Sequence, residues 1–136
     1  LKTLRLYKKE KLCSTRAIEQ LFAAGGADFS RLCYPLRALA RNNERRSSDA
    51  PVAFLISVPK KRLRHAVDRV LMRRRIREAY RLQHQGYAMP DGMRIDLGFV
   101  YVANDSMPYS AVEKAMRRIL EALSQHYSNT QATAAD

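Results

Sequence analysis

The sequence predicts an α+β fold, a small two-layer sandwich of helices packed on a mixed or antiparallel sheet. Stretches with helical periodicity and short strand-like runs follow one another in the order α-β-β-(β)-α-β-α, which favours helices that cover a sheet. The chain has 136 residues, of which 46% are apolar, as is typical of one globular domain. We therefore expect a single domain over residues 1–128, followed by a polar tail at 129–136.

A short helix is expected over residues 14–24, after a basic, partly extended arm at residues 1–12. The Ser14 hydroxyl can accept a hydrogen bond from a backbone N–H of the first turn. Apolar side chains between positions 17 and 22 recur with helical spacing, and Gly25-Gly26 ends the helix. These features predict an amphipathic helix with one apolar face.

Three segments are expected to be extended. Residues 29–40 alternate only loosely, and Pro35 indicates an edge or a bulge there. The polar segment 42–50 reads as a long hairpin loop, and the apolar run 52–58 as a strand buried on both faces. Residues 94–102 alternate cleanly, which predicts a strand with one apolar side.

Two longer helices complete the pattern. The first is expected over residues 65–85, with Gly86 just past its end, and the second over residues 110–127. The first of these helices has an apolar flank that can pack on the sheet. This flank consists of Met72, Ile76, Ala79 and Tyr80.

The basic charge of the chain is concentrated before and along the first long helix. The formal net charge is +12, and Arg outnumbers Lys, which favours a phosphate-bearing polyanion as partner. Residues 59–81 hold ten basic side chains against two acidic ones, a net charge of +8. The ten are Lys60, Lys61, Arg62, Arg64, Arg69, Arg73, Arg74, Arg75, Arg77 and Arg81.

Several of these arginines form a ridge along the helix. Arg69, Arg73, Arg77 and Arg81 are spaced four residues apart, with Arg74 beside them. Like charges at this spacing each cost an isolated helix about 0.2–0.5 kcal/mol, and a bound polyanion would relieve that repulsion. A solvated face is the alternative for part of the ridge, because Glu78 can pair with Arg74 or Arg81. Charge does not distinguish RNA from DNA, although no helix-turn-helix pattern flanks this helix.

The residues that could form a catalytic or metal site are scattered. The three histidines lie far apart, no pair of carboxylates is apparent, and Cys13 and Cys33 match no metal-ligand spacing. We therefore expect no catalytic residue and no metal ligand in the protein. The absence of a membrane-spanning run and of a secretory signal predicts a cytoplasmic protein that binds no membrane. A ribosomal or other structural RNA-binding protein would also explain the basic charge and the α+β fold.

Residues 54–61 read Phe-Leu-Ile-Ser-Val-Pro-Lys-Lys, and residues 65–81 read His-Ala-Val-Asp-Arg-Val-Leu-Met-Arg-Arg-Arg-Ile-Arg-Glu-Ala-Tyr-Arg. This pattern resembles the protein subunit of bacterial ribonuclease P. That family has a strand ending in Ser-Val-(Ser)-Lys-Lys, then a helix with Ala-Val, Arg-Asn-Arg, Lys-Arg and Arg-Glu-Ala-(Phe/Tyr)-Arg. Residues 17–25, 96–103 and 109–114 extend the resemblance, in order, over nearly the whole chain.

The resemblance implies a fold, an activity and partners. The fold would contain a left-handed βαβ crossover around the basic helix, as in the family and the second domain of ribosomal protein S5. The partners would be ribonuclease P RNA, in a 1:1 complex with a monomeric protein, and precursor tRNA. The RNA would be the catalyst, removing the 5′ leader by Mg²⁺-dependent hydrolysis. The protein itself would hold no cofactor firmly.

The resemblance also implies which residues bind RNA. Those expected to bind the catalytic RNA are Lys60, Lys61, Arg64, Arg69, Arg73, Arg74, Arg77 and Arg81. The leader of precursor tRNA would lie in a cleft between the first helix and the sheet. The candidates there are Ile18, Phe22, Tyr34 and Arg37. Ordinary core packing is an equal alternative for Ile18, Leu21 and Phe22.

Two positions depart from the family pattern. Val70 stands where the family has Asn, and Leu71 where it has the second Arg of the Arg-Asn-Arg signature. Val70 is therefore an apolar residue among arginines, and the polar contacts made there in the family are not expected here. Arg62 and Arg75 could compensate for the missing charge, although not for its geometry.

Overall fold

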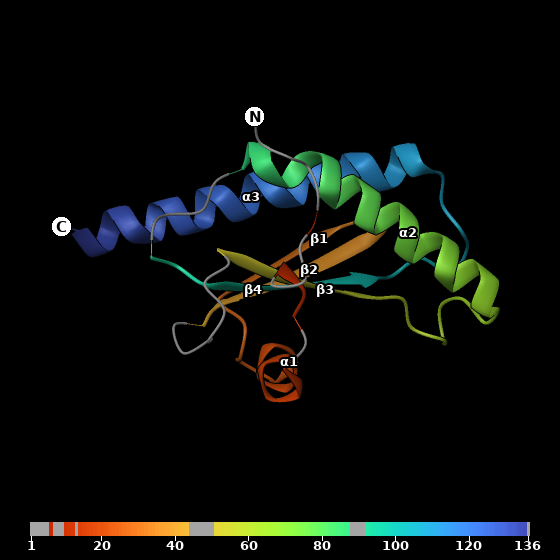
Figure 1. Ribbon diagram of the computed structural model, residues 1–136, viewed down its shortest axis with the longest axis horizontal. Coiled ribbons are helices and arrows are strands. Elements are labelled where there is room, and N and C mark those ends of the chain that lie inside the picture. Colours follow the sequence, from red (N-terminus) through yellow and green to blue (C-terminus); the bar gives the residue numbers. More distant parts are fainter. Residues whose placement is uncertain (1–5, 7–9, 13, 44–50, 88–91, 136) are drawn as a thin grey trace.

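A four-stranded mixed sheet forms the middle of the molecule, and helices lie on both of its faces (Figure 1). The computed structural model describes residues 6, 10–12, 14–43, 51–87 and 92–135. The strands lie in the order β1-β2-β4-β3. They are β1 (Phe29–Cys33), β2 (Leu36–Asn42), β3 (Val52–Ser57) and β4 (Ile95–Tyr101). β2 pairs antiparallel with β1 and β4, whereas β3 pairs parallel with β4, so the predicted α+β class with a mixed sheet is confirmed.

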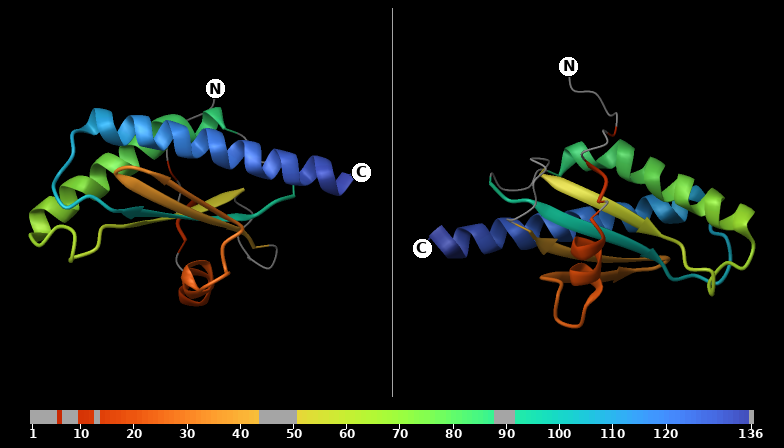
Figure 2. Two further views of the ribbon diagram at one scale, coloured as in Figure 1. Left: turned by 180° about the vertical axis from the view of Figure 1, so that it is seen from behind. Right: turned by 60° about the horizontal axis from the view of Figure 1, so that its bottom comes forward.

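The helices are divided unequally between the two faces. α2 (Ala66–Gln83) and α3 (Tyr109–Ala135) pack side by side on one face, and α1 (Thr15–Phe22) lies on the other (Figures 1 and 2). A short 3-10 helix, η2 (His84–Gly86), continues α2. The main core therefore lies between the sheet and the two long helices, and a smaller apolar cluster lies under α1.

The connection from β3 through α2 to β4 is a left-handed crossover. In the right-hand view of Figure 2, α1 is in front of the sheet and β3 and β4 both run from left to right. α2 returns behind the sheet, and β4 lies below β3. Parallel crossovers are right-handed in about 98% of cases, so elementary packing rules predict the opposite hand. The handedness implied by the resemblance is confirmed.

The apolar side of β4 and the apolar flank of α2 meet in the main core. Ile95, Leu97, Phe99 and Tyr101 alternate along β4 and are all fully buried. The predicted flank of α2 is buried against them, and the Tyr80 ring contacts both Phe54 and Phe99. Burial of one such large side chain stabilises the fold by about 1.5–3 kcal/mol. This packing fixes which face of α2 remains toward solvent.

Two expectations about the strands are wrong. The segment 29–40 is not one extended run, because residues 34–35 turn the chain between β1 and β2 and β2 continues to Asn42. The segment 42–50 does not close a hairpin, because β4 lies between β2 and β3; positions 44–50 themselves lie outside the described residues.

β3 is less buried than its apolar run predicts. Ala53 and Phe54 are buried on opposite faces, but Leu55 and Ile56 are only half-buried, since β3 is the last strand of the sheet. Part of the N-terminal arm runs along its free edge. There the backbone N–H of Leu12 donates to the carbonyl oxygen of Phe54 at 2.8 Å. The predicted arm is thus extended at Lys11 and Leu12, whereas Glu10 lies in a 3-10 turn.

The ends of the helices differ slightly from expectation. The backbone N–H of Ala17 donates to the Ser14 hydroxyl at 3.3 Å, so the predicted N-cap of α1 is confirmed. α3 continues to Ala135, beyond the expected end near Tyr127, so positions 129–135 of the predicted tail are helical. No helix within the described residues is both long and apolar enough to span a membrane.

Candidate nucleic-acid interface

The outer side of α2 presents basic side chains to solvent. Arg73, Arg74 and Arg77 are exposed, whereas Met72 and Ile76 on the opposite side are fully buried. Because the buried flank holds the helix in one orientation, these three arginines face solvent together. We call Arg73, Arg74 and Arg77 the cationic face. This is the middle of the ridge predicted from the four-residue spacing.

The two ends of the ridge make contacts within the protein. At the N-terminal end, Arg69 is half-buried, and its Nη1 donates to the carbonyl oxygens of Leu63 at 2.9 Å and Arg64 at 2.8 Å. These bonds tie the loop after β3 to the first turns of α2. Arg69 thus stabilises the entry to the helix, and only part of its guanidinium is available to a partner.

At the C-terminal end, Arg81 pairs with Glu78, one of the two pairings that the sequence left open. The Nε of Arg81 donates to Oε2 of Glu78 at 2.9 Å, and this hydrogen bond holds the pKa of Glu78 below its ordinary value. Glu78 is therefore ionised at neutral pH. Its negative charge partly neutralises this end of the ridge.

Arg75 does not belong to the cationic face. Its side chain is half-buried, and Nη1 donates to the carbonyl oxygen of Met107, in the segment that leads into α3. Arg75 therefore keeps its charge beside the cationic face, but its guanidinium is bonded within the protein. Neighbouring helical residues point about 100° apart, and this rotation directs Arg75 toward α3.

The remaining predicted basic residues lie in the loop between β3 and α2. Lys60, Lys61 and Arg64 are all exposed. Lys61 also lines a cleft on the α1 side of the sheet, together with Arg62. The loop thus carries positive charge from the cationic face to the opposite side of the sheet.

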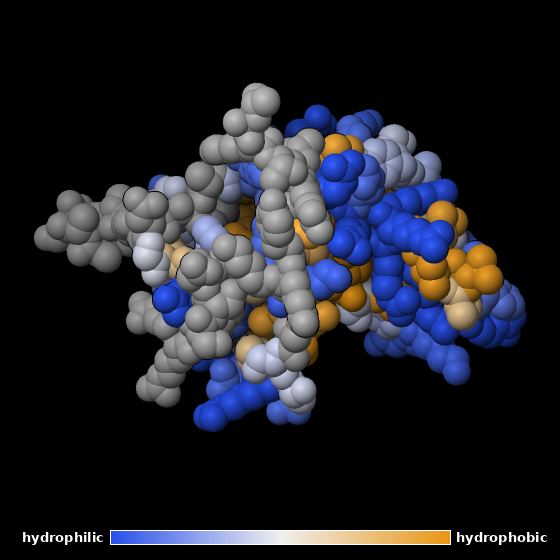
Figure 3. Space-filling view, in the orientation of Figure 1, coloured by the Kyte–Doolittle hydropathy of each residue, from blue (hydrophilic) through white to orange (hydrophobic). Residues whose placement is uncertain are grey.

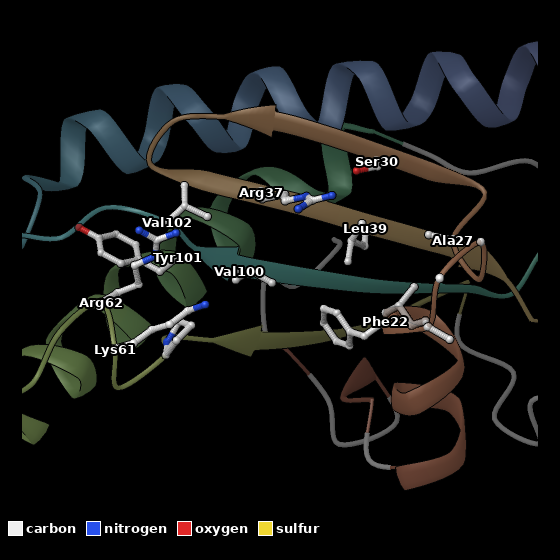
Figure 4. Close-up of a pocket in the computed structure, with 15 residues that line it drawn as sticks. Phe22, Ala27, Ser30, Arg37, Leu39, Lys61, Arg62, Val100, Tyr101 and Val102 are labelled. Carbon is white, nitrogen blue, oxygen red and sulfur yellow. The ribbon is translucent and has the colours of Figure 1, made fainter.

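The cleft lies between the end of α1 and the sheet and has a volume of about 560 Å³ (Figure 4). Its floor consists of Arg37 and Leu39 from β2 and Val100 from β4. Phe22 stands at one end, and Lys61 and Arg62 gather at the other (Figure 4). The cleft therefore combines an apolar end with a cationic end.

Of the four residues predicted to line this cleft, two do so. Phe22, whose side chain is 40% exposed, and Arg37 both line it. Ile18 instead packs, half-buried, against the small cluster beneath α1. Tyr34 is 62% exposed in the turn between β1 and β2 and is not among the lining residues. Core packing, the alternative considered for Ile18, describes its position.

Gly98 allows the Phe22 ring to lie close to the sheet. A Cβ built on Gly98, in the middle of β4, would lie 3.0 Å from Cζ of Phe22 and 3.2 Å from Cδ2 of Leu21. The absence of a side chain at this position thus allows α1 to approach the sheet closely. The alternation of residues 94–102 predicts that Gly98 lies on the side away from the main core, but not that α1 covers it.

Sequence reasoning missed two further features of the cleft. Arg62 is held at its mouth, because Nη1 donates to Oδ1 of Asn104 at 3.2 Å. The Tyr101 hydroxyl donates to the carbonyl oxygen of Asp105, and burial raises the pKa of Tyr101 to about 12. Tyr101 is therefore neutral at physiological pH and leaves the positive charge at this end of the cleft undiminished.

The side chains at these two surfaces suit nucleic acid better than a metal ion. Guanidinium and ammonium groups bind phosphate, and an aromatic ring such as that of Phe22 can stack on a base. Within the residues that the structure describes, no group of three or more His, Cys, Asp or Glu side chains could hold a metal ion. The described residues thus form two cationic surfaces, on α2 and in the cleft, which the basic loop after β3 connects.

Comparisons with known proteins agree in naming one family. The sequence model of the ribonuclease P family matches residues 6–124. Ribonuclease P protein components from two strains of Porphyromonas gingivalis are each 33% identical over 124 residues, covering 87% of this chain and 85% of theirs. The solved RNase P protein of Staphylococcus aureus has a similar fold, with a TM-score of 0.66 at 16% identity over 84% of this chain and 94% of that chain.

Proposed function

Because the chain belongs to the ribonuclease P protein family, we propose that its two cationic surfaces bind two different RNAs. A protein of this family is part of an endoribonuclease complex with an RNA partner, and this complex matures the 5′ ends of tRNA. The cationic face of α2 binds the catalytic RNA of the complex. The cleft beneath α1 binds the 5′ leader of precursor tRNA. The observation that carries this division is that the two surfaces lie on opposite sides of one sheet.

On α2, the exposed arginines supply paired N–H donors that match the oxygens of a phosphate. Like charges in this face repel one another, and a bound phosphate backbone relieves that repulsion. Arg69 and Arg81 form hydrogen bonds within the protein, through which they stabilise the loop after β3 and the end of α2. They also add to the positive electrostatic potential at the cationic face. We therefore assign the strongest contacts with the catalytic RNA to Arg73, Arg74 and Arg77.

In the cleft, Phe22 offers its ring to a base of the single-stranded leader, while Arg37 and Lys61 bind the phosphates on either side. Ile18 has no ring to stack, and its packing beneath α1 assigns it to the core. The exposed Tyr34 lies beyond the lining of the cleft. A leader that continues beyond the Tyr101 end of the cleft would reach Tyr34.

The hydrolysis itself belongs to the RNA. The described residues contain no cluster of carboxylates or histidines that fits a catalytic Mg²⁺. We therefore place the Mg²⁺ required for leader removal in the RNA. The protein's net charge of +12 offsets repulsion between two RNAs that must meet. A monomeric protein acting in the cytoplasm, in a 1:1 complex with the RNA, suffices for this role.

Reconstitution of the complex tests the proposal. Purified protein mixed with precursor tRNA and Mg²⁺ should give no cleavage, and addition of the catalytic RNA should restore it. The reconstituted complex should also bind precursor tRNA more tightly than mature tRNA, because only the former has a leader. Cleavage by the protein alone, with contaminating nucleases excluded, would contradict the assignment of chemistry to the RNA. Recovery of ribosomal RNA in place of the catalytic RNA in a pull-down would contradict the assignment of the partner.

A further inference from the structure

The N-terminal half of α2 exposes three aliphatic side chains to solvent. Val67 is 79% exposed, Val70 40% and Leu71 37%. They are spaced i, i+3 and i+4, so they lie together on one side of the helix. We call these three residues the aliphatic patch. Figure 3 shows apolar side chains gathered over this end of α2, beside basic ones.

The aliphatic patch does not contribute to the core. α2 already buries its opposite flank through residues such as Met72 and Ile76. Arg74 follows Val70 by one helical turn, which is about 5–6 Å along the axis. On the solvent side of α2, the aliphatic patch therefore comes first along the helix and the cationic face follows it.

This division restricts the chemistry of the partner. A phosphate group pressed against aliphatic side chains would lose its hydration without compensation. A second copy of the protein packed on this side would bring two cationic faces together, and their like charges would repel. RNA with unpaired bases offers apolar base surfaces directly beside phosphates, which complements both halves.

We propose that the aliphatic patch packs against unpaired nucleobases of the RNA whose phosphates bind the cationic face. This inference rests on the proposed function of α2 and adds that the RNA segment at Val67, Val70 and Leu71 is a loop, a bulge or an unpaired joint. A continuous A-form helix would present riboses and phosphates at this position, not base faces.

Substitution of the patch by polar residues that favour helices tests this. The variant Val67→Gln/Val70→Gln/Leu71→Gln keeps helix propensity close to that of the wild type. Leu82→Gln is the matched control, because Leu82 is 44% exposed on the same helix but lies beyond the cationic face. The probe is the catalytic RNA of ribonuclease P, titrated at several salt concentrations, and thermal unfolding verifies that each variant is folded.

We expect the triple variant to bind about tenfold more weakly at every salt concentration, because it loses apolar contact area. The slope of log affinity against log salt should stay unchanged, since no phosphate contact is lost. Chemical probing should show a few unpaired bases that wild-type protein protects and the triple variant leaves reactive. Leu82→Gln should match the wild type in all three measurements.

Three results would overturn the inference. The first is an affinity for the triple variant equal to that of Leu82→Gln. The second is a loss of slope, which would mean that the patch acts by displacing phosphate contacts. The third is a wild-type dimer that the triple variant converts to monomer in sedimentation equilibrium, which would identify a second copy as the occupant.

An Arg73→Ala/Arg77→Ala variant in the same titration separates this inference from the proposed function. If that variant loses slope while the triple variant binds normally, the inference fails and the proposed function stands. If neither variant binds differently from the wild type, the assignment of α2 as the RNA surface fails as well.

Discussion

On α2, three exposed arginines lie within five consecutive positions of one helix. The cleft on the opposite side of the sheet is instead assembled from α1, β2, β4 and the loop after β3. The cationic face contains three arginines and no aromatic ring. The cleft combines two arginines and a lysine with the exposed ring of Phe22. The two surfaces therefore bind RNA through different balances of charge and stacking.

This difference can be measured. Contacts to phosphate release counterions, so each contributes about 0.9 to the slope of log affinity against log salt for a duplex, and about 0.7 for a single strand. Stacking contributes to affinity with little effect on that slope. Variants of the two surfaces should therefore differ in salt dependence as well as in affinity.

The largest effect is expected from Arg73→Ala combined with Arg77→Ala. Loss of two charge-assisted contacts should weaken binding of the catalytic RNA by about a hundredfold, from about 1.5 kcal/mol for each contact. The slope should fall by about 1.8, which is twice the value for one phosphate. Affinity measured between low and high salt gives both quantities.

Arg117→Ala with Arg118→Ala is the matched control for this prediction. It removes the same charge from exposed positions of α3, outside the cationic face. An equal loss of slope in the control would show that net charge, not the face on α2, determines RNA binding.

The second largest effect is expected from Phe22→Ala. Loss of one stacked ring should reduce the leader-dependent part of precursor-tRNA affinity by about 1–3 kcal/mol, with the salt slope nearly unchanged. The measurement compares the reconstituted complex on precursor and mature tRNA. Ile18→Ala is the contrast, because Ile18 packs beneath α1 and should affect the free energy of unfolding instead. Equal losses of leader affinity in both variants would mean that Ile18 also contributes to binding of the leader.

The sequence predicts the two surfaces to different extents. A helical surface follows from periodicity, so the buried flank of α2 and the exposure of Arg73, Arg74 and Arg77 could be predicted from spacing alone. What spacing could not predict is which neighbouring element each side chain meets. Arg75 bonds to the carbonyl oxygen before α3, and Arg69 to the loop after β3.

The cleft was less predictable because it depends on tertiary placement. The amphipathic pattern of α1 predicts a buried side but does not specify which face of the sheet it covers. Phe22 and Arg37 came from the resemblance, and Arg62, Leu39 and Val100 came only from the structure. The left-handed crossover likewise came from the resemblance, since packing rules favour the other hand.

A smaller effect is expected from Gly98→Ala. The added Cβ would lie 3.0 Å from the Phe22 ring and 3.2 Å from Leu21, so these side chains must move by a few tenths of an ångström. Leader-dependent affinity should fall by a few-fold, less than in Phe22→Ala, because the ring is displaced and not removed. Gly86→Ala is the control, since a Cβ there has no neighbour within 4 Å. Unchanged leader affinity in Gly98→Ala would mean that the position of the ring over the sheet is not critical.

The smallest effect, and one of opposite sign, is expected from Glu78→Gln. Glu78 is ionised at neutral pH and pairs with Arg81, so its replacement releases Arg81 and deletes a negative charge beside Arg77. The catalytic RNA should bind a few-fold more tightly, and the salt slope should steepen by up to about 0.9 if Arg81 gains a phosphate. Tighter binding with an unchanged slope would mean that Glu78 acts on the cationic face through its charge alone. Weaker binding would mean that the pair with Glu78 positions Arg81 for RNA, which would extend the functional part of the ridge to its last residue.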